Sequence, residues 1–577
     1  MAGLRAGLWA GALAAVGWAA AQESPEQLKP DPARVTIHGE VRNGATGQPL
    51  PRALVRIEGD ADTGTLTDGE GRFEIHGLPV GPQTIRVVKP GFHDRPYATE
   101  EVGNPADGPA HSLLVAAQMP DLVFTLTPNC AIHGHIQLST GDPAEGMSIN
   151  LLKKVVRYGR AVWLQGGVVR TNGDGNYRFA GLSDGVYALY TTPSLESERA
   201  VTLLAARGRG GIARNGYPSV FYPDARDLAG AARIHVSAGE QAEANFSLAL
   251  EPFYPVTAMG TLPGPGNKAA PPEGSAVVFD ATGHLLPYIP QDDATNHSLQ
   301  ADLPDGTYVM AMAALPRGAS PGDDGPIFAG ANAMSGSVEF TVAGHPVTGL
   351  RIPLGPSQIT TVHLRFVHSN AGPTGSPAAT GNAWDLVNLT LDTAEGIPSP
   401  GGGESIGMIE TVPDVLQFAP LAGTYWLNTM LPRKDWCAGP LNAGGLNLAV
   451  DPLTVSLASA TPPMELTLRD DCATLTLNLP PGLAAFVPGE EPFYTVYVVP
   501  DFDTTVSIPP MTMHPSSGTT LTIDGLTPGS YHVYTFDSGV HLEYRNPAVM
   551  AALASPGQAV TLSAEAASSL TLEVPGP

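Results

Sequence analysis

The residues best placed to do chemistry are the serines of three Gly-x-Ser-x-Gly pentapeptides, Ser183, Ser320 and Ser405. In a serine hydrolase this pentapeptide forms the strand-to-helix turn that presents the nucleophile, and an acid and a histidine follow on the same α/β scaffold. None of the three copies is followed by a helical pattern, and a chain with 66 glycines is expected to contain about one match by composition alone. We therefore expect no catalytic residue. Ser405, with His514 and Asp537 downstream, is kept as the alternative.

Metal ligation is the second chemistry that the side chains suggest. His133 and His135 are two apart, so they share one face of a predicted strand, and Cys130 lies close by. No third or fourth ligand is spaced to complete a zinc or copper site. The segment from Asn172 to Asn176 begins like a calcium loop, but its sixth position is not a glycine and its twelfth is not an acid. A hairpin turn explains that segment, and we expect neither a metal nor another cofactor.

Exposed aromatic rings would provide a third chemistry, because sugar faces stack on them. The candidate ligand-binding aromatics are Trp163, Tyr217, Tyr222 and Trp436. The competing interpretation is that these rings pack in a core or cover a sheet edge.

The elements that carry these residues are marked by a short cadence that occurs five times. It consists of apolar residues two apart, then a leucine, a glycine-bearing turn and, in four copies, a tyrosine. Such alternation predicts strands with one buried face, and the turn predicts a β-hairpin. The copies recur every ~105 to 120 residues, the size of a small domain. We therefore predict an all-β fold of tandem antiparallel β-sandwich domains of the transthyretin-like or immunoglobulin-like type. The copies begin at Phe73, Tyr177, Leu303, Leu416 and Leu521.

Composition and charge limit the classes of partner. The 577 residues include 66 glycines and 56 prolines, with 43% hydrophobic and 15% charged residues. This supports several apolar cores but not long helices. The formal net charge of -25 would repel nucleic acid and anionic membrane surfaces. We expect no nucleic-acid partner.

The N-terminal segment has the layout of a secretory signal. Arg5 precedes an apolar run that ends in small residues, so residues 1–21 are predicted to be removed after Ala21, and residues 22–33 form a linker. No later segment is long and apolar enough to cross a membrane. The mature chain is expected to be exported and to be periplasmic, cell-surface associated or extracellular.

Residues 34–127 carry several spaced elements in a fixed order: an Ile-His-Gly-Glu-Val strand from Ile37, a Thr-Gly-Gln-Pro-Leu-Pro turn from Thr46, and an Asp-Gly-Glu-Gly turn from Asp68. With the cadence that follows, this stretch resembles the carboxypeptidase regulatory-like domain, a transthyretin-like sandwich of about seven strands. Residues 128–250 resemble a second copy, as in bacterial envelope proteins with tandem copies. Three further β-sandwiches are predicted at 251–355, 356–469 and 470–577.

The three cysteines allow at most one intramolecular disulfide. We expect the pair Cys437 and Cys472, which would close a loop of about 35 residues and contribute about 3–4 kcal/mol. Cys130 holds a place before a strand like that of Cys472 in its own repeat, so those two should lie far apart. The alternative is that all three are small buried thiols.

These observations predict an exported, non-catalytic protein that acts as a binding or scaffolding module. Its partner would be a polysaccharide or an envelope protein, bound through loops and open sheet edges. The carbohydrate interpretation rests on the resemblance of the fold to starch-binding-like domains. The alternatives are a structural spacer or adhesion component of the envelope and, more remotely, a serine hydrolase at Ser405.

Overall fold

The predicted all-β class is confirmed by the computed structural model, whose described residues form strands almost throughout. Within them, one short helix occurs, α2 (Pro547–Ala551). The structure describes residues 34–574 except for gaps at 59–62, 95–109, 117, 197–213, 263–273, 294–297, 315–333, 357–358, 368–385, 398–407, 413, 419, 421, 457–458, 482–493, 514–518 and 538–539.

The strands group into modules, each built around one hydrophobic core. The first module has a sheet of order β4-β1-β8-β6 packed on a sheet of order β3-β2-β5-β7. Its strands are β1 (Arg34–Asn43), β2 (Leu54–Ile57), β3 (Gly64–Leu66), β4 (Arg72–Pro79), β5 (Gly81–Val88), β6 (Phe92–Asp94), β7 (Ala110–Val115) and β8 (Leu122–Pro128).

The second and third modules share a sheet, because β14 and β15 leave the second module and extend the third module's sheet beside β19. The second module contains β9 (Cys130–Leu138), β10 (Ser148–Arg157), β11 (Arg160–Arg170), β12 (Asn176–Leu182), β13 (Gly185–Thr191), β14 (Ser194–Leu195), β15 (Arg214–Tyr217), β16 (Ile234–Val236), β17 (Gln241–Glu243) and β18 (Phe246–Leu248). The third contains β19 (Glu251–Thr261), β20 (Gly274–Asp280), β21 (Leu285–Leu286), β22 (Gln291–Asp293), β23 (Ser298–Pro304), β24 (Gly306–Ala314), β25 (Met334–Val342), β26 (Val347–Pro353) and β27 (Gly355–Pro356).

The fourth and fifth modules each pack two sheets of their own. The fourth contains β28 (Thr360–Val367), β29 (Asn388–Thr393), β30 (Met408–Val412), β31 (Val415–Phe418), β32 (Gly423–Met430), β33 (Cys437–Ala443), β34 (Leu446–Asn447), β35 (Leu453–Val455) and β36 (Met464–Arg469). The fifth contains β37 (Ala473–Asn478), β38 (Tyr494–Pro500), β39 (Met511–Met513), β40 (Thr520–Leu526), β41 (Gly529–Phe536), β42 (Gln558–Leu562) and β43 (Ala567–Thr571), with α2 between β41 and β42.

One pairing pattern repeats in all five modules. The first strand of each module pairs antiparallel with one neighbour and parallel with a strand from the module's end. One sheet of each module is therefore mixed, whereas the other is antiparallel, as was predicted for both. Side-chain alternation reports which face is buried and carries no information about the direction of the partner strand. The first strands and their antiparallel and parallel partners are β1 with β4 and β8, β9 with β12 and β18, β19 with β23 and β26, β28 with β31 and β36, and β37 with β40 and β43.

The five cadences are not hairpins, so that expectation was wrong. In every copy the strand before the turn and the strand after it belong to different sheets, as β4 and β5 do in the first module. The turn therefore carries the chain from one layer of the sandwich to the other. The same apolar alternation fits both cases, because either strand of such a corner also buries one face.

At three of the corners whose turn residues the structure describes, a tyrosine holds the turn. The hydroxyl donates a hydrogen bond to the backbone carbonyl four residues earlier, from Tyr187 to Ser183 at 2.8 Å, from Tyr308 to Pro304 at 3.0 Å and from Tyr531 to Thr527 at 2.6 Å. The ring thus folds back over the turn, as in the tyrosine corner of other sandwiches. A Cβ built on Gly306 would lie 2.8 Å from the Tyr308 hydroxyl oxygen, which explains the glycine there.

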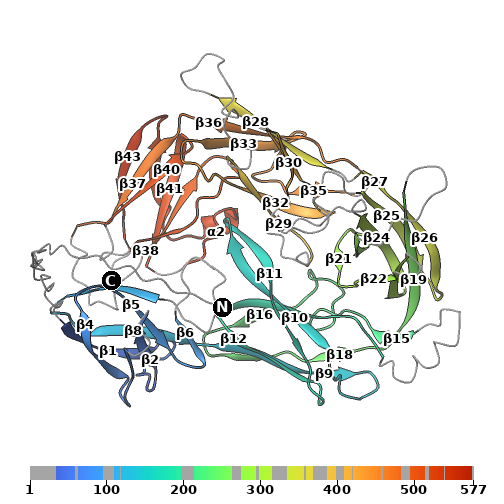
Figure 1. Ribbon diagram of the computed structural model, residues 1–577, viewed down its shortest axis with the longest axis horizontal. Helices are drawn as coiled ribbons and strands as arrows, with labels where there is room; N and C mark the ends of the chain where they lie inside the picture. Colours follow the sequence, from blue (N-terminus) through green and yellow to red (C-terminus); the bar gives the residue numbers. More distant parts are fainter. Residues whose placement is uncertain are drawn as a thin grey trace, which may run out of the picture.

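The five modules lie around the β10–β11 hairpin, which points from the second module toward α2 in the fifth and β29 in the fourth (Figure 1). The chain order runs around the outside of this arrangement. Modules distant in sequence therefore meet in the middle.

The corner predicts a local loss of stability in Tyr531→Phe. The variant leaves the partly buried Thr527 carbonyl without its donor, so β40 and β41 should lose about 1 kcal/mol of local stability. Hydrogen exchange of residues 520–536, followed by mass spectrometry, measures this. Tyr254→Phe is the matched control, because the Tyr254 hydroxyl makes no hydrogen bond within the described part of the chain. Equal exchange in the two variants would show that the hydrogen bond is not what holds the corner.

Candidate functional site

An open groove of about 1090 Å³ lies on the first module. Its walls come from the outer face of β1, β4 and β8 and from the short strand β3 of the other sheet. It is lined by His38, Gly39, Glu40, Thr63, Gly64, Thr65, Leu66, Asp68, Arg72, Phe73, Glu74, Ile75, His76, Asp121 and Val123.

The polar face of this groove follows from alternation along β1 and β4. Ile37 and Ile75 face the core, at 1% and 4% exposure, so their neighbours turn outward. Glu74 lies between two imidazoles, with its Oε1 atom 3.7 Å from Nδ1 of His38 and 3.6 Å from Nδ1 of His76. The groove therefore offers mainly hydrogen-bonding and charged groups, and Phe73 is the one aromatic residue of its lining.

The candidate aromatics lie elsewhere and are largely engaged in packing. Tyr217 and Trp436 are each only 5% exposed, in the cores of the second and fourth modules. Tyr222 packs edge-on against Phe246, with ring centroids 5.5 Å apart. Because the rings of Tyr217 and Trp436 are buried, neither has a face free for a sugar, and no stacking role is proposed for them.

Trp163, like Tyr222, is only partly buried. It lies half-buried on β11, and the Arg233 guanidinium sits 4.8 Å from its ring centroid. One face is thus covered by a cation, and the packing neighbours form a cluster between modules.

The hydrolase alternative falls mainly outside the described residues, where Ser405, Ser320 and His514 lie. Ser183 is described, and its carbonyl accepts the hydrogen bond of the Tyr187 corner. Asp537 is exposed at the end of the strand that follows the fifth corner.

The metal candidates are placed more clearly. His133 and His135 lie half-buried on β9. Among the residues that the structure describes, no group of three or more histidine, cysteine, aspartate or glutamate side chains could hold a metal ion. The Asn172 carboxamide oxygen accepts the backbone N–H groups of Asp174 and Asn176 at 3.1 and 2.9 Å. That side chain therefore shapes a turn.

The turn of the β10–β11 hairpin contacts the fourth module through an ion pair. Nη1 of Arg157 lies 2.9 Å from Oδ1 of Asp392, whose side chain is only 4% exposed, and Nδ2 of Asn428 donates to the other carboxylate oxygen at 3.0 Å. A buried carboxylate needs such partners, since an unpaired charge in a low-dielectric environment is strongly unfavourable.

The same turn also reaches the fifth module. The Arg545 N–H donates to the Gly159 carbonyl at 2.9 Å, and a Cβ on Gly159 would lie 2.5 Å from the Tyr544 ring.

Arg160, the residue after Gly159, contacts the fourth module. Its guanidinium lies 3.9 Å from the centroid of the Trp426 ring and donates a hydrogen bond to the Ala449 carbonyl. Burial, with a smaller contribution from Arg545, lowers the pKa of Arg160 to about 10.

The sequence signal for this contact was weak. Two arginines flank Tyr158 and Gly159 in this turn. Tyr158 and Gly159 both have a positive φ, and this pattern predicts only a hairpin turn. Nothing in the local sequence indicates that the turn is seated between two other modules.

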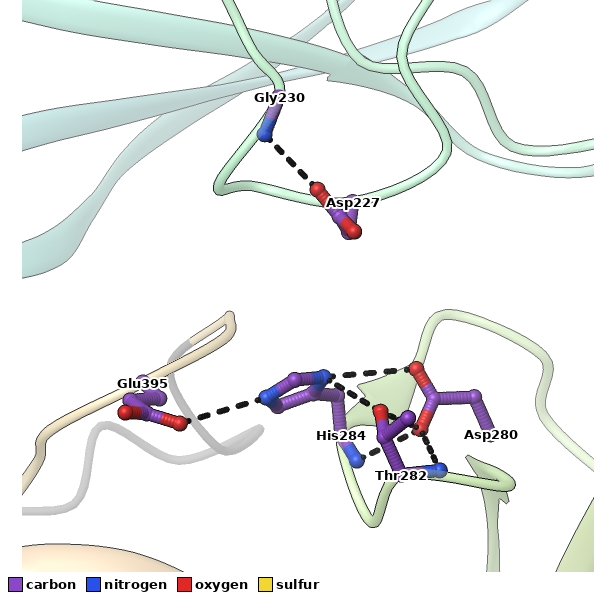
Figure 2. A network of polar contacts seen from close by, with 6 residues as sticks. All are labelled: Asp227, Gly230, Asp280, Thr282, His284 and Glu395. Atoms are coloured by element: carbon purple, nitrogen blue, oxygen red, sulfur yellow. Dashed lines mark hydrogen bonds and ion pairs between the residues drawn. The ribbon is translucent and has the colours of Figure 1, made fainter.

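A second junction joins the second, third and fourth modules. Figure 2 shows the Asp280 carboxylate accepting hydrogen bonds from Thr282 and from the His284 backbone, while the His284 ring points toward Glu395. Nε2 of His284 lies 3.5 Å from Oε2 of Glu395. The loop around Asp227 comes from the second module, and the apolar residues that pack the junction are Leu228, Ala231, Leu285 and Ile397.

A disulfide joins Cys437 and Cys472, the pair expected from the sequence, with 5.6 Å between their Cα atoms. Cys437 lies on β33 of the fourth module, and Cys472 lies just before the first strand of the fifth. The bond therefore clamps the connection between these modules. Cys130 is buried and free, and burial raises the pKa of its thiol.

The fourth and fifth modules also share backbone and side-chain hydrogen bonds. The Thr429 N–H donates to the Thr505 carbonyl at 2.9 Å, and the Thr527 hydroxyl donates to the Ala438 carbonyl at 2.8 Å.

The fold and these contacts define the class, a protein of five β-sandwich modules joined by inter-module contacts. The carboxypeptidase regulatory-like domain matches residues 36–110, so the first module carries that domain. The tandem second copy at 128–250 stays a prediction. No helix in the described residues is long and apolar enough to cross a membrane.

Solved structures with some similarity include two pilins. The ancillary pilin of a Streptococcus is 13% identical, the match covering 56% of this chain and 100% of that one, with a TM-score of 0.19. A minor pilin of Streptococcus agalactiae is also 13% identical, with coverage of 37% and 95% and a TM-score of 0.18. TM-scores this low carry no argument about this chain. A search of curated proteins found no match.

The seated hairpin predicts that Arg157→Met loosens the contact with the fourth module. Removing one partner of a fully buried ion pair costs about 3–5 kcal/mol, and about 2–3 is expected here because Arg157 is 22% exposed. Faster hydrogen exchange in residues 386–397 would report it. Arg170→Met, at the far end of β11, is the control, since Arg170 is exposed and makes no ion pair within the described residues. Unchanged exchange would show that the ion pair does not hold the hairpin.

The second junction predicts acid sensitivity through Asp280. Burial raises the pKa of this carboxyl, but hydrogen bonds from Thr282 and His284 outweigh burial, so the net pKa is below its ordinary value. The stability that Asp280 contributes is therefore complete above about pH 4 and is lost as the pH falls through the lower pKa of the folded state.

Asp280→Asn should be less stable than wild type by about 1 kcal/mol at pH 7. The gap between their thermal midpoints should narrow at pH 3 and below. A gap that does not change with pH would contradict this assignment.

Proposed function

We propose that this chain is an exported, non-catalytic binding and scaffolding protein of the cell envelope, whose five modules form one platform. The observation that carries the proposal is the seating of the β10–β11 turn against Asp392 of the fourth module and Tyr544 of the fifth. A contact of this kind fixes modules that are far apart in sequence. The platform holds the groove of the first module at a defined place.

The platform differs from the spacer alternative in shape. A spacer would gain length from modules that follow one another in a row, and a contact from the second module back to the fourth and fifth shortens such a row. The inter-module contacts support a compact arrangement (Figure 1).

The partner is a polysaccharide or an envelope protein that meets a mainly polar surface. The groove supports this through its carboxylates, imidazoles and threonines. Hydrogen-bonding groups of this kind suit sugar hydroxyls as well as peptide backbones.

Small-angle scattering of the chain without residues 1–21 tests the platform. A compact chain of this length has a radius of gyration of about 25 Å, whereas five sandwiches in a row, each about 35 Å long, would give about 50 Å. A value near 50 Å would contradict the platform and favour the spacer.

Binding and catalysis are tested on the same preparation. The proposal predicts retention on at least one insoluble polysaccharide or capture of an envelope protein. Trp163→Ala should leave retention unchanged, because Trp163 lies on β11 of the second module and does not line the groove. Absence of any retention, or an esterase or peptidase activity abolished by Ser405→Ala, would overturn the proposal.

A further inference from the structure

The groove of the first module is bordered by two strand edges. Its lining runs through consecutive residues, from Arg72 to His76 along β4 and from Thr63 to Leu66 along β3. A strand seen from its face offers alternate residues only. Phe73 is 5% exposed and belongs to the core, so it can line the groove only where the edge of β4 is open.

Each of these strands has one partner in the part of the chain that the structure describes. β4 pairs with β1, and β3 pairs with β2. Strand β3 has three residues, whereas β4 has eight. Strand β4 therefore offers the longer edge, and unpaired edges of this kind accept an added strand.

The direction of the backbone groups on β4 follows from its ladder. The Val41 N–H of β1 donates to the Gly71 carbonyl at 2.8 Å. Backbone groups alternate sides along a strand, so Gly71, Phe73 and Ile75 turn theirs toward β1. Those of Glu74 turn toward the groove, where an incoming strand would meet them. The backbone groups of Arg72 are bonded to Asp68, and the regular pairing with β1 is interrupted after Ile75.

The charge of the groove selects the kind of strand. Glu40, Asp68, Glu74 and Asp121 supply four carboxylates, and Arg72 supplies one guanidinium. Arg42, next to the groove, forms an ion pair with Glu40. With neutral histidines the lining is net negative, on a chain whose formal charge is -25. A cationic side chain opposite Glu74 gains a favourable cross-strand pair, and an anionic ligand is repelled.

We infer that the groove binds an extended cationic peptide segment, which adds as a strand to the free edge of β4. The inference rests on the proposed binding role and names the partner as a protein segment rather than a polysaccharide. The peptide backbone pairs with Glu74, at the centre of the part of β4 that lines the groove. Every second side chain of the peptide lies on the face of Glu74 and carries the positive charge, while the others point toward Thr65 of β3 and toward Thr63, which precedes β3.

The probe is the fluorescein-labelled peptide acetyl-Lys-Thr-Lys-Thr-Lys-Thr-Lys-amide, titrated by fluorescence anisotropy against the chain without residues 1–21. Saturable binding is expected, and Glu74→Gln should weaken it three- to fivefold. Glu145→Gln is the matched control, an exposed acid on a turn of the second module, and it should leave the affinity unchanged. Equal affinities for wild type and Glu74→Gln would overturn the assignment to this groove.

A second probe separates strand addition from charge attraction without altering the protein. The same peptide with N-methyl groups on alternate residues keeps its charges but cannot pair on that edge, so its affinity should fall at least tenfold. Equal binding of the methylated peptide would show charge attraction alone and overturn the strand addition. Binding of a glutamate-for-lysine peptide at the same affinity would also overturn it.

The two proposals fail in different ways. If the chain binds the peptide but is not retained on any polysaccharide and captures no envelope protein, the assignment of the groove stands and the proposed envelope role is contradicted. Retention on a polysaccharide that Glu74→Gln does not weaken, with no peptide binding, supports the platform and removes the peptide.

Discussion

The burial of one arginine-bearing turn between two distant modules is the constraint on which the arrangement depends. Asp392 is almost fully enclosed, and Arg157 and Asn428 help to make its negative charge tolerable there. The desolvation of Arg160 is offset in the same way by the Trp426 ring and the Ala449 carbonyl. These polar contacts have strict geometry, so they specify one seating of the hairpin where apolar contact alone would allow several.

Much of the fold was accessible from the sequence, because alternation records burial. The apolar residues of β4 and β40 lie two apart, and the all-β class follows from them. The corner was misinterpreted as a hairpin, because a two-layer corner and a hairpin bury the same alternate side chains. The tyrosine was the missed signal. Its place two residues after the glycine, as in Gly306 and Tyr308, lets the hydroxyl return to the turn, which a hairpin between paired strands does not require.

The candidate sites were harder to predict. Large rings such as Trp436 are suited both to ligand stacking and to a core, and only the three-dimensional packing decides between them. The groove could not be predicted because its residues have no distinctive sequence pattern. His38 and Glu74 read as an ordinary solvated face of a strand, and the open edge beside them depends on which strands pair, a property of topology rather than of local sequence. The seating of the β10–β11 turn is likewise a long-range contact.

The parallel pairing of each module's first strand with a strand from its end has a consequence for how the chain is assembled. Two neighbouring parallel strands begin at the same end of the sandwich and finish at the opposite end. The chain therefore exits a module where the next can begin, and β8 is followed by β9 after a single residue, as β36 is followed by β37 after three. Such a unit can be concatenated head to tail in any number without a return loop. Because the chain enters such a module at one end and leaves it at the other, the modules can be joined in series.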